Sequence, residues 1–182
     1  TPFFDLHARG AFTVPDEDQA TALYDVTQFI CADAGLSAYE VSNHAKPGAE
    51  CRHNLTYWRY GDYVGVGPGA HGRITKDGVK RATVIERMPS KWLASVEAHD
   101  HGLVDQETIT PSQSAEEMML MGLRLEEGVS LERYASLAGK PINPGRLIEL
   151  SDDGLLQTNG DQLRATPTGR LVLNKLLGEL LA

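Results

Sequence analysis

Residues 36–72 read LSAYEVSNHAKPGAECRHNLTYWRYGDYVGVGPGAHG, and both ends of this stretch indicate strands. Apolar and polar residues alternate in Leu36–Ser42, and a second apolar run, Tyr63–Val66, ends in glycines. Alternation with a period of two residues is typical of a half-buried strand. A polar segment that contains Lys46-Pro47-Gly48 separates the two runs, so the stretch predicts strand, loop, strand.

The sequence on either side extends this pattern. Residues 15–34 predict a helix, because carboxylates open the segment and apolar residues recur at helical spacing. Arg73–Val84 predicts a hairpin around Asp77-Gly78, since this dipeptide accepts the positive φ of a tight turn. The predicted order of helix, strand, loop and strand is that of an α/β fold. Two strands cannot bury both faces of a parallel sheet, so this half predicts an incomplete sheet or barrel whose remaining strands lie upstream.

The carboxy-terminal part changes character near Thr110. Residues 89–101 predict a connecting helix, and Thr110-Pro111 opens another, whose methionines are expected to fill a core. Two shorter helices, a ribbon turning at Asn159-Gly160 and a last helix capped by Thr166 or Thr168 follow. Three helices, a ribbon and a helix indicate a small winged-helix-like α+β domain.

Composition restricts the function. The formal net charge is −8, and residues 111–182 carry seven Lys and Arg against ten Asp and Glu, so a nucleic-acid partner is not expected. Two cysteines, Cys31 and Cys51, favour a reducing cytoplasm, with a disulfide between them left open. We expect no transmembrane helix and no secretory signal. The absence of an initial Met fits a fragment or a processed product.

One dense stretch, His53–Tyr63, holds four aromatic residues and a histidine. The imidazole of His53 is a candidate axial iron ligand, and the rings of Tyr57 and Trp58 could pack on a porphyrin. Asn54 could orient the histidine through its second ring nitrogen. The alternative is a packed aromatic loop whose histidine makes ordinary hydrogen bonds.

A second candidate is the glycine-rich end of the second predicted strand. Gly65, Gly67, Gly69 and Ala70 would let a ligand approach the backbone closely. The alternative is a simple bend, because no helix follows as a dinucleotide fingerprint requires. Cys51-Arg52-His53 could be half of a metal site, but no second ligand pair has suitable spacing.

These motifs together resemble radical-SAM proteins of the HemW group, a branch of the oxygen-independent coproporphyrinogen III oxidase family. The resemblance rests on Tyr39–Gly48, His53–Trp58 and Gly61–Gly72. It implies that residues 1–88 form the carboxy-terminal part of a partial β/α barrel. Residues 89–109 would then be a helix that connects the barrel to the family's carboxy-terminal domain, residues 110–182. In the full-length parent the barrel would hold a [4Fe-4S] cluster and S-adenosylmethionine.

The resemblance also implies roles for single residues. The HNxxYW pattern of the haem-chaperone branch is intact as His53, Asn54, Tyr57 and Trp58, which would bind haem, with His53 on the iron. The glycine-rich segment would line the S-adenosylmethionine end of the barrel. The family's CxxxCxxC loop is absent from this sequence, and a cluster needs thiolates, so the chain alone is expected to be inactive.

Three functions follow from the sequence. The first is part of a haem chaperone, with haem and a haem-receiving client protein as partners and a homodimer as one arrangement open to it. The second is an oxygen-independent coproporphyrinogen III oxidase, which decarboxylates two propionates in porphyrin biosynthesis. The third is a winged-helix nucleic-acid module, which the acidic charge disfavours.

Overall fold

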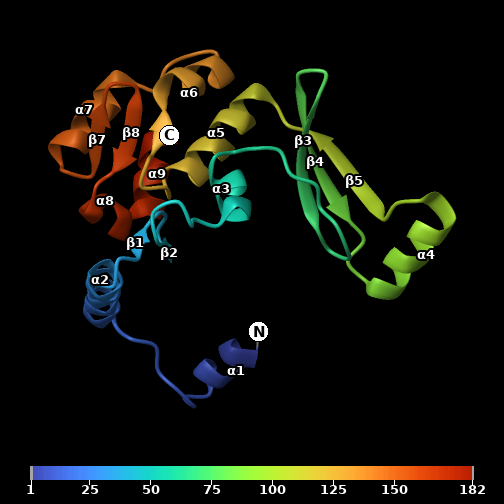
Figure 1. Cartoon of the computed structure of the whole chain (residues 1–182), viewed down its shortest axis with the longest axis horizontal. Helices are drawn as coiled ribbons and strands as arrows, with labels where there is room; N and C mark the ends of the chain where they lie inside the picture. Colours follow the sequence, from blue (N-terminus) through green and yellow to red (C-terminus); the bar gives the residue numbers. More distant parts are fainter. Residues whose placement is uncertain (1, 182) are drawn as a thin grey trace.

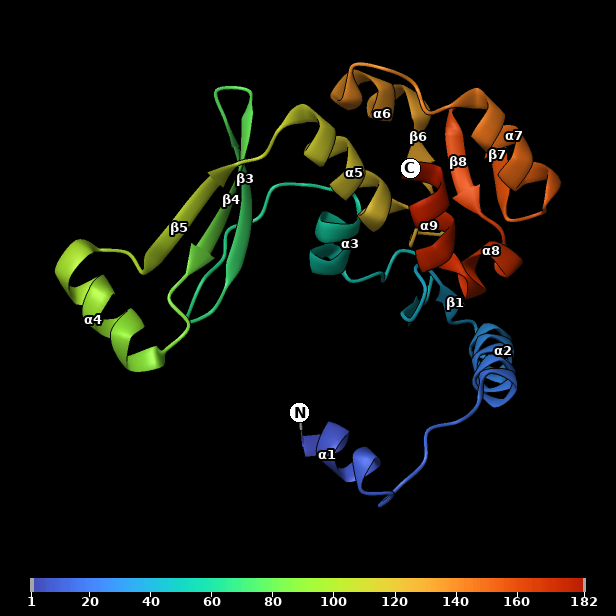
Figure 2. The ribbon, with the colours of Figure 1, turned by 180° about the vertical axis from the view of Figure 1, so that it is seen from behind.

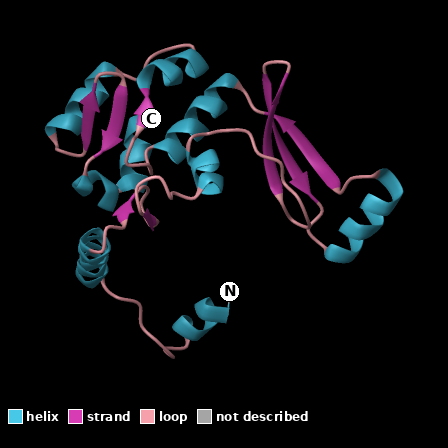
Figure 3. Ribbon diagram, in the orientation of Figure 1, coloured by secondary structure: helices cyan, strands magenta, loops and turns pink. Residues whose placement is uncertain are grey.

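The computed structural model describes residues 2–181 and has a mixed α/β fold, as expected (Figure 1, Figure 3). Thr1 and Ala182 lie outside the described part. The strands form three small sheets, and every strand pair within residues 2–181 is antiparallel. These are β1–β2 (Ser37–Ala38, His44–Ala45), β3–β4–β5 (His71–Lys76, Val79–Ile85, Leu103–Thr108) and β6–β8–β7 (Val129–Ser130, Gln162–Ala165, Leu156–Asn159).

Two helices open the chain, α1 (Pro2–Ala8) and α2 (Glu17–Asp33). The predicted helix over residues 15–34 is confirmed, with Asp16 as its N-cap accepting the backbone N–H of Gln19 at 2.8 Å. Its apolar residues do not pack, however: Val26 is 54% exposed and Phe29 73%. Figure 2 shows α2 at the edge of the chain, where it contacts β1, and Gln28 of α2 lies 3.1 Å from His44 Nε2. The periodicity therefore predicted the helix without predicting burial.

The two strands predicted around the aromatic stretch are wrong in extent. Only Ser37 and Ala38 of residues 36–42 form a strand, because Glu40 turns the chain by accepting bonds from Ser42 and Asn43. Residues 63–66 contribute a single bridge, Tyr63 to Arg73. No parallel strand pair occurs within residues 2–88, so the described strands do not confirm a barrel.

The hairpin prediction is confirmed. Strands β3 and β4 pair in register around Asp77 and Gly78, which both take positive φ. Strand β5, which the sequence did not predict, joins β4 after helix α4 (Pro89–His99). Gly102, between them, has its backbone against the Trp92 ring, where a Cβ atom would lie 2.3 Å from ring carbon Cδ1. Close packing thus fixes α4 against this sheet.

The carboxy-terminal body contains the main core. Its helices are α5 (Pro111–Gly122), α6 (Leu131–Ala138), α7 (Pro144–Asp152), α8 (Pro167–Leu171) and α9 (Leu173–Leu181). Side chains at the start of four of them satisfy backbone N–H groups: Thr110, Ser130, Asn143 and Thr166. The predicted helices are confirmed, except that the last one is divided at Val172 into α8 and α9, and Thr166 rather than Thr168 caps α8.

The core of this body is apolar and closed. It includes Met118 and Met119 of α5, Leu123 directly after this helix, Leu163 of β8, and Leu176 and Leu177 of α9, all at most 2% exposed. The predicted core role is confirmed for Met118 and Met119, whereas Met121 is only half-buried. Such burial contributes about 1.5–3 kcal/mol per large side chain.

None of the described helices has the length and hydrophobicity that a membrane crossing requires.

Met119→Ala tests the core. Met119 is fully buried, so its truncation should lower the free energy of unfolding by about 2–5 kcal/mol. Leu120, its neighbour on α5, is 44% exposed, so Leu120→Ala should cost less than about 1 kcal/mol. Urea unfolding followed by circular dichroism measures both. Equal losses would contradict the described packing of α5.

Candidate functional site

The aromatic stretch is not a loop: residues Arg52–Trp58 form helix α3, two turns that pack on α5. This corrects the prediction of a loop between two strands. Residues four apart share a face of a helix, so His53 and Tyr57 lie together. The Tyr57 hydroxyl is 2.9 Å from His53 Nε2, and the ring centroids are 4.5 Å apart at 81°. His53 is exposed, so its imidazole is presented to solvent.

The aromatic cluster continues beyond α3. The Tyr57 ring lies 4.2 Å from the Tyr63 ring, measured between centroids, in an edge-on arrangement. Burial raises the pKa of Tyr63 above its ordinary value. The sequence noted Tyr63 only as part of a dense aromatic run, whereas the fold makes it the link between α3 and the glycine-rich segment.

Asn54 does not orient His53. Its side-chain amide donates to the hydroxyl of Tyr39 at 3.3 Å, because adjacent residues of a helix face different directions. The backbone oxygen of Tyr39 in turn accepts the N–H of Glu126. Asn54 therefore ties α3 to the segment that runs along the carboxy-terminal body, and Tyr57 is the residue that holds His53.

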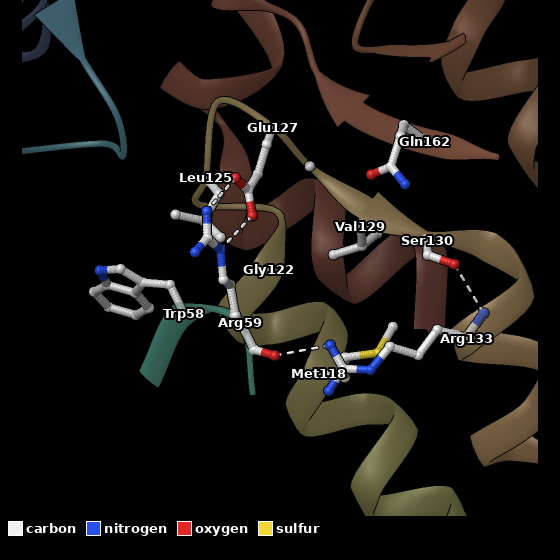
Figure 4. A pocket seen from close by; sticks show the side chains of 11 residues that line it. Trp58, Arg59, Met118, Gly122, Leu125, Glu127, Val129, Ser130, Arg133 and Gln162 are labelled. Atoms are coloured by element: carbon white, nitrogen blue, oxygen red, sulfur yellow. Dashed lines mark hydrogen bonds and ion pairs between the residues drawn. The ribbon is translucent and has the colours of Figure 1, made fainter. Parts of the chain in front are cut away.

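Trp58 faces another side of α3. It lines a small pocket of about 220 Å³ together with Arg59, Met118 and other residues of the carboxy-terminal body (Figure 4). Its indole N–H is buried without a hydrogen-bond partner in the described part, and the Arg124 guanidinium lies 5.6 Å from the ring centroid. Of the four motif residues, His53 and Tyr57 thus share one face of α3, Asn54 contacts Tyr39, and Trp58 lines a separate pocket.

The glycine-rich segment folds back on the β3–β4 hairpin. A Cβ atom on Gly65 would lie 2.6 Å from the backbone oxygen of His71, so the two backbones need this close approach. Gly67 and Gly69 take φ values of 94° and 74°. Ala70 accepts the N–H of Ile85 at 2.9 Å. The close approach at Gly65 and the positive φ of Gly67 and Gly69 explain why glycine occupies these three positions. A simple bend, the alternative given by the sequence, requires the same residues.

Thiolate ligands are sparse. Cys31 and Cys51 are free, the first half-buried in α2 and the second exposed before α3. No three His, Cys, Asp or Glu side chains within residues 2–181 lie close enough to hold a metal ion. A four-iron cluster held by three cysteines does not fit this donor set. A haem iron, which needs one axial imidazole, fits the exposed His53.

Charged contacts fix α3 and the sheet against the carboxy-terminal body. Arg59 contacts Glu127 through two bonds of 2.7 Å. Arg73 of β3 contacts Glu117 of α5 through bonds of 3.0 and 2.9 Å, about a quarter exposed. Burial favours a raised pKa for Glu117, but the hydrogen bonds and the charge of Arg73 outweigh it, so the pKa lies below its ordinary value.

The sequence of this chain is similar to those of known proteins. Residues 109–172 match the HemN C-terminal domain family. The whole chain aligns with the Bacillus subtilis heme chaperone HemW at 31% identity over 48% of that protein's length, and 93% of it aligns with the Escherichia coli HemW at 34% identity. The chain belongs to the HemW-like radical SAM proteins.

The HemW-like chain also matches the bovine mitochondrial radical S-adenosyl methionine domain-containing protein 1, at 32% identity over all of the chain and 43% of that protein. It spans less than half the length of these relatives, in their carboxy-terminal part. Its fold is similar to that of the Escherichia coli coproporphyrinogen III oxidase HemN, with a TM-score of 0.66 over 91% of the chain and 42% of HemN, at 14% identity.

Glu117→Gln tests the link between the sheet and α5. Because the folded-state pKa of Glu117 is lowered, its stabilisation is present above the ordinary pKa and is lost as pH falls through the lowered one. We expect Glu117→Gln to cost about 1 kcal/mol at pH 7, and the difference from wild type to shrink as pH falls below the ordinary pKa of a carboxyl group.

Glu116→Gln is the matched control, since Glu116 is exposed and its carboxylate accepts a hydrogen bond from the Ser112 hydroxyl rather than from an arginine. Urea unfolding at several pH values measures both variants. A Glu117→Gln deficit that stayed the same at every acidic pH at which both variants remain folded would rule out the ion pair as its source.

Proposed function

We propose that this HemW-like chain is the carboxy-terminal part of a haem chaperone, and that the His53 and Tyr57 face of α3 binds the haem. The observation that carries the proposal is an exposed imidazole that packs against the Tyr57 ring, which in turn packs against Tyr63. Imidazole is a common axial ligand of haem iron, and aromatic rings pack well on a porphyrin. The relatives named heme chaperone HemW support the same assignment.

His53 would hold the iron through one of its two ring nitrogens. Nε2 is engaged by the Tyr57 hydroxyl, so coordination through Nε2 requires that hydrogen bond to be released. Asn54 would keep α3 in place through Tyr39, and Trp58 would anchor the helix in the inner pocket. A ligand held against an exposed face, rather than in a closed cavity, suits a protein that passes haem to a client.

The remaining cofactors belong to the parent protein in this proposal. Residues 1–88 would end a radical-SAM barrel, and Gly65, Gly67, Gly69 and Ala70 would line its S-adenosylmethionine end. The cluster ligands would come from outside this sequence, since its two cysteines do not suffice.

Residues 89–109 would connect the barrel to a winged-helix-like domain of residues 110–182. The order of elements supports this part of the proposal: α5, β6, α6 and α7 are followed by the β7–β8 hairpin, with β8 between β6 and β7 in the sheet.

The partners and compartment are also part of the proposal. We propose haem and a haem-receiving protein as partners, with self-association as a homodimer open to test by sedimentation. We propose a cytoplasmic location. The mitochondrial name of the bovine relative gives the alternative compartment, which cell fractionation distinguishes.

The second candidate is a coproporphyrinogen III oxidase, which the fold likeness to HemN favours. The intact HNxxYW pattern ranks it below the chaperone. Oxidative decarboxylation of coproporphyrinogen by the full-length, cluster-loaded protein would favour the oxidase over the chaperone. Haem binding without turnover would favour the chaperone.

His53→Ala tests the iron ligand. Loss of the axial imidazole should weaken haem binding to the chain by at least about tenfold, which corresponds to 1.4 kcal/mol, and shift the Soret band. His99→Ala is the control, because His99 is also exposed but lies at the end of α4, away from α3. A haem titration followed by absorbance measures both. Equal effects would remove His53 from the site.

Tyr57→Phe tests which nitrogen binds. Phenylalanine keeps the ring but frees Nε2, so haem affinity should rise about 2- to 10-fold, the equivalent of one hydrogen bond of about 0.5–1.5 kcal/mol. The same titration measures it, with Tyr57→Ala showing the loss of the ring. Weaker binding by Tyr57→Phe would mean that the hydroxyl itself contributes to holding haem.

A further inference from the structure

A groove of about 700 Å³ lies between the β3–β4–β5 sheet and helices α5 and α6. Lys80 of β4 and Arg133 of α6 are among its lining residues, on opposite walls. Sites for small molecules commonly occur where two bodies of a protein meet, and this volume suits a ligand of several hundred daltons. The residues proposed for haem, on α3, do not line the groove.

Two cationic side chains converge in the groove on one oxygen atom. Lys80 Nζ and an Arg133 guanidinium nitrogen both donate to the backbone oxygen of Tyr60, each at 3.3 Å. The two cationic nitrogens are therefore close neighbours. Like charges held together repel, and an anion between them would relieve the repulsion.

Only one of the two charges is matched by a carboxylate. Lys80 contacts Asp62 at 2.9 Å. Burial favours a raised pKa for Asp62, but hydrogen bonds from Lys80 and Thr75 hold the pKa below its ordinary value. The Asp62 carboxylate therefore stays ionised and matches the charge of Lys80. Arg133 makes no salt bridge within residues 2–181; it donates to the backbone oxygens of Arg59 and Tyr60. The lining thus keeps one positive charge in a chain of net charge −8.

The rest of the lining is apolar or carries hydroxyl groups. Ser136 and Leu137 follow Arg133 at the spacing that puts side chains on one face of α6. Val79 and Ile109 contribute apolar surface from the opposite side, and Thr108 a hydroxyl. A ligand that matches these walls has an apolar body and a single anionic end.

We propose that this groove binds an amphipathic monocarboxylate, with the carboxylate at Arg133 and Lys80 and the apolar part against Leu137 and Ile109. The guanidinium fork of Arg133 has donors beyond the two that the backbone oxygens use, which suits a carboxylate. The site is separate from the proposed haem face and does not depend on it.

Octanoate is the probe, added to the ¹⁵N-labelled chain without haem and followed by amide chemical shifts. Saturable shifts are expected at Thr108, Ser136 and Leu137. Octylammonium, with the same chain and opposite charge, should bind at least about tenfold more weakly, as expected when a charged hydrogen bond of about 1.5–3 kcal/mol is lost. Shifts confined to the exposed apolar face of α2, or equal binding of both probes, would overturn the proposal.

Ser136→Trp should fill the groove and abolish the octanoate shifts, since Ser136 is an exposed helix residue of the lining. Ser151→Trp is the matched control, on α7 and outside the lining. Arg133→Leu should weaken octanoate about tenfold while leaving octylammonium unchanged. Undiminished octanoate binding by folded Ser136→Trp would overturn the site, whatever the outcome of any haem titration.

Discussion

The backbone oxygen of Tyr60 holds the parts of this protein together. Tyr60 follows α3, is 5% exposed and takes a φ of 54°, a conformation that costs a non-glycine residue free energy. Lys80 from the sheet and Arg133 from α6 both bond its carbonyl, and the Lys80 ammonium lies 4.1 Å from its ring centroid. Burial raises the pKa of its hydroxyl to about 12. Tyr60 thus links α3, and with it His53, to both the sheet and α6, beside the contacts of Asn54 and Arg59.

Features encoded by neighbouring residues could be predicted from the sequence. The Asp77-Gly78 turn, the helices of the carboxy-terminal body and the buried methionines of α5 follow from local turn chemistry, capping and periodicity. The family also followed from motif order. The pairing of His53 with Tyr57 follows from helical spacing, but only once α3 is known to be a helix.

Features set by distant contacts could not be predicted. Strand β5 is mostly exposed and lacks an alternating pattern, so it exists only because β4 offers a free edge. The expected second strand at Tyr63–Val66 is replaced by backbone packing of Gly65 on His71. The partner of Asn54 is Tyr39, fifteen residues away. Each of these depends on which surfaces the fold brings together.

The tight contact between Gly102 and the Trp92 ring has a spectroscopic consequence. The chain has two tryptophans, Trp92 beside the β3–β5 sheet and Trp58 against the carboxy-terminal body. Variants that keep one indole each would therefore emit from two different parts of the molecule. Their fluorescence would report separately on melting of the sheet with α4 and of the contact between α3 and the carboxy-terminal body, and would tell whether the two parts unfold as one cooperative unit.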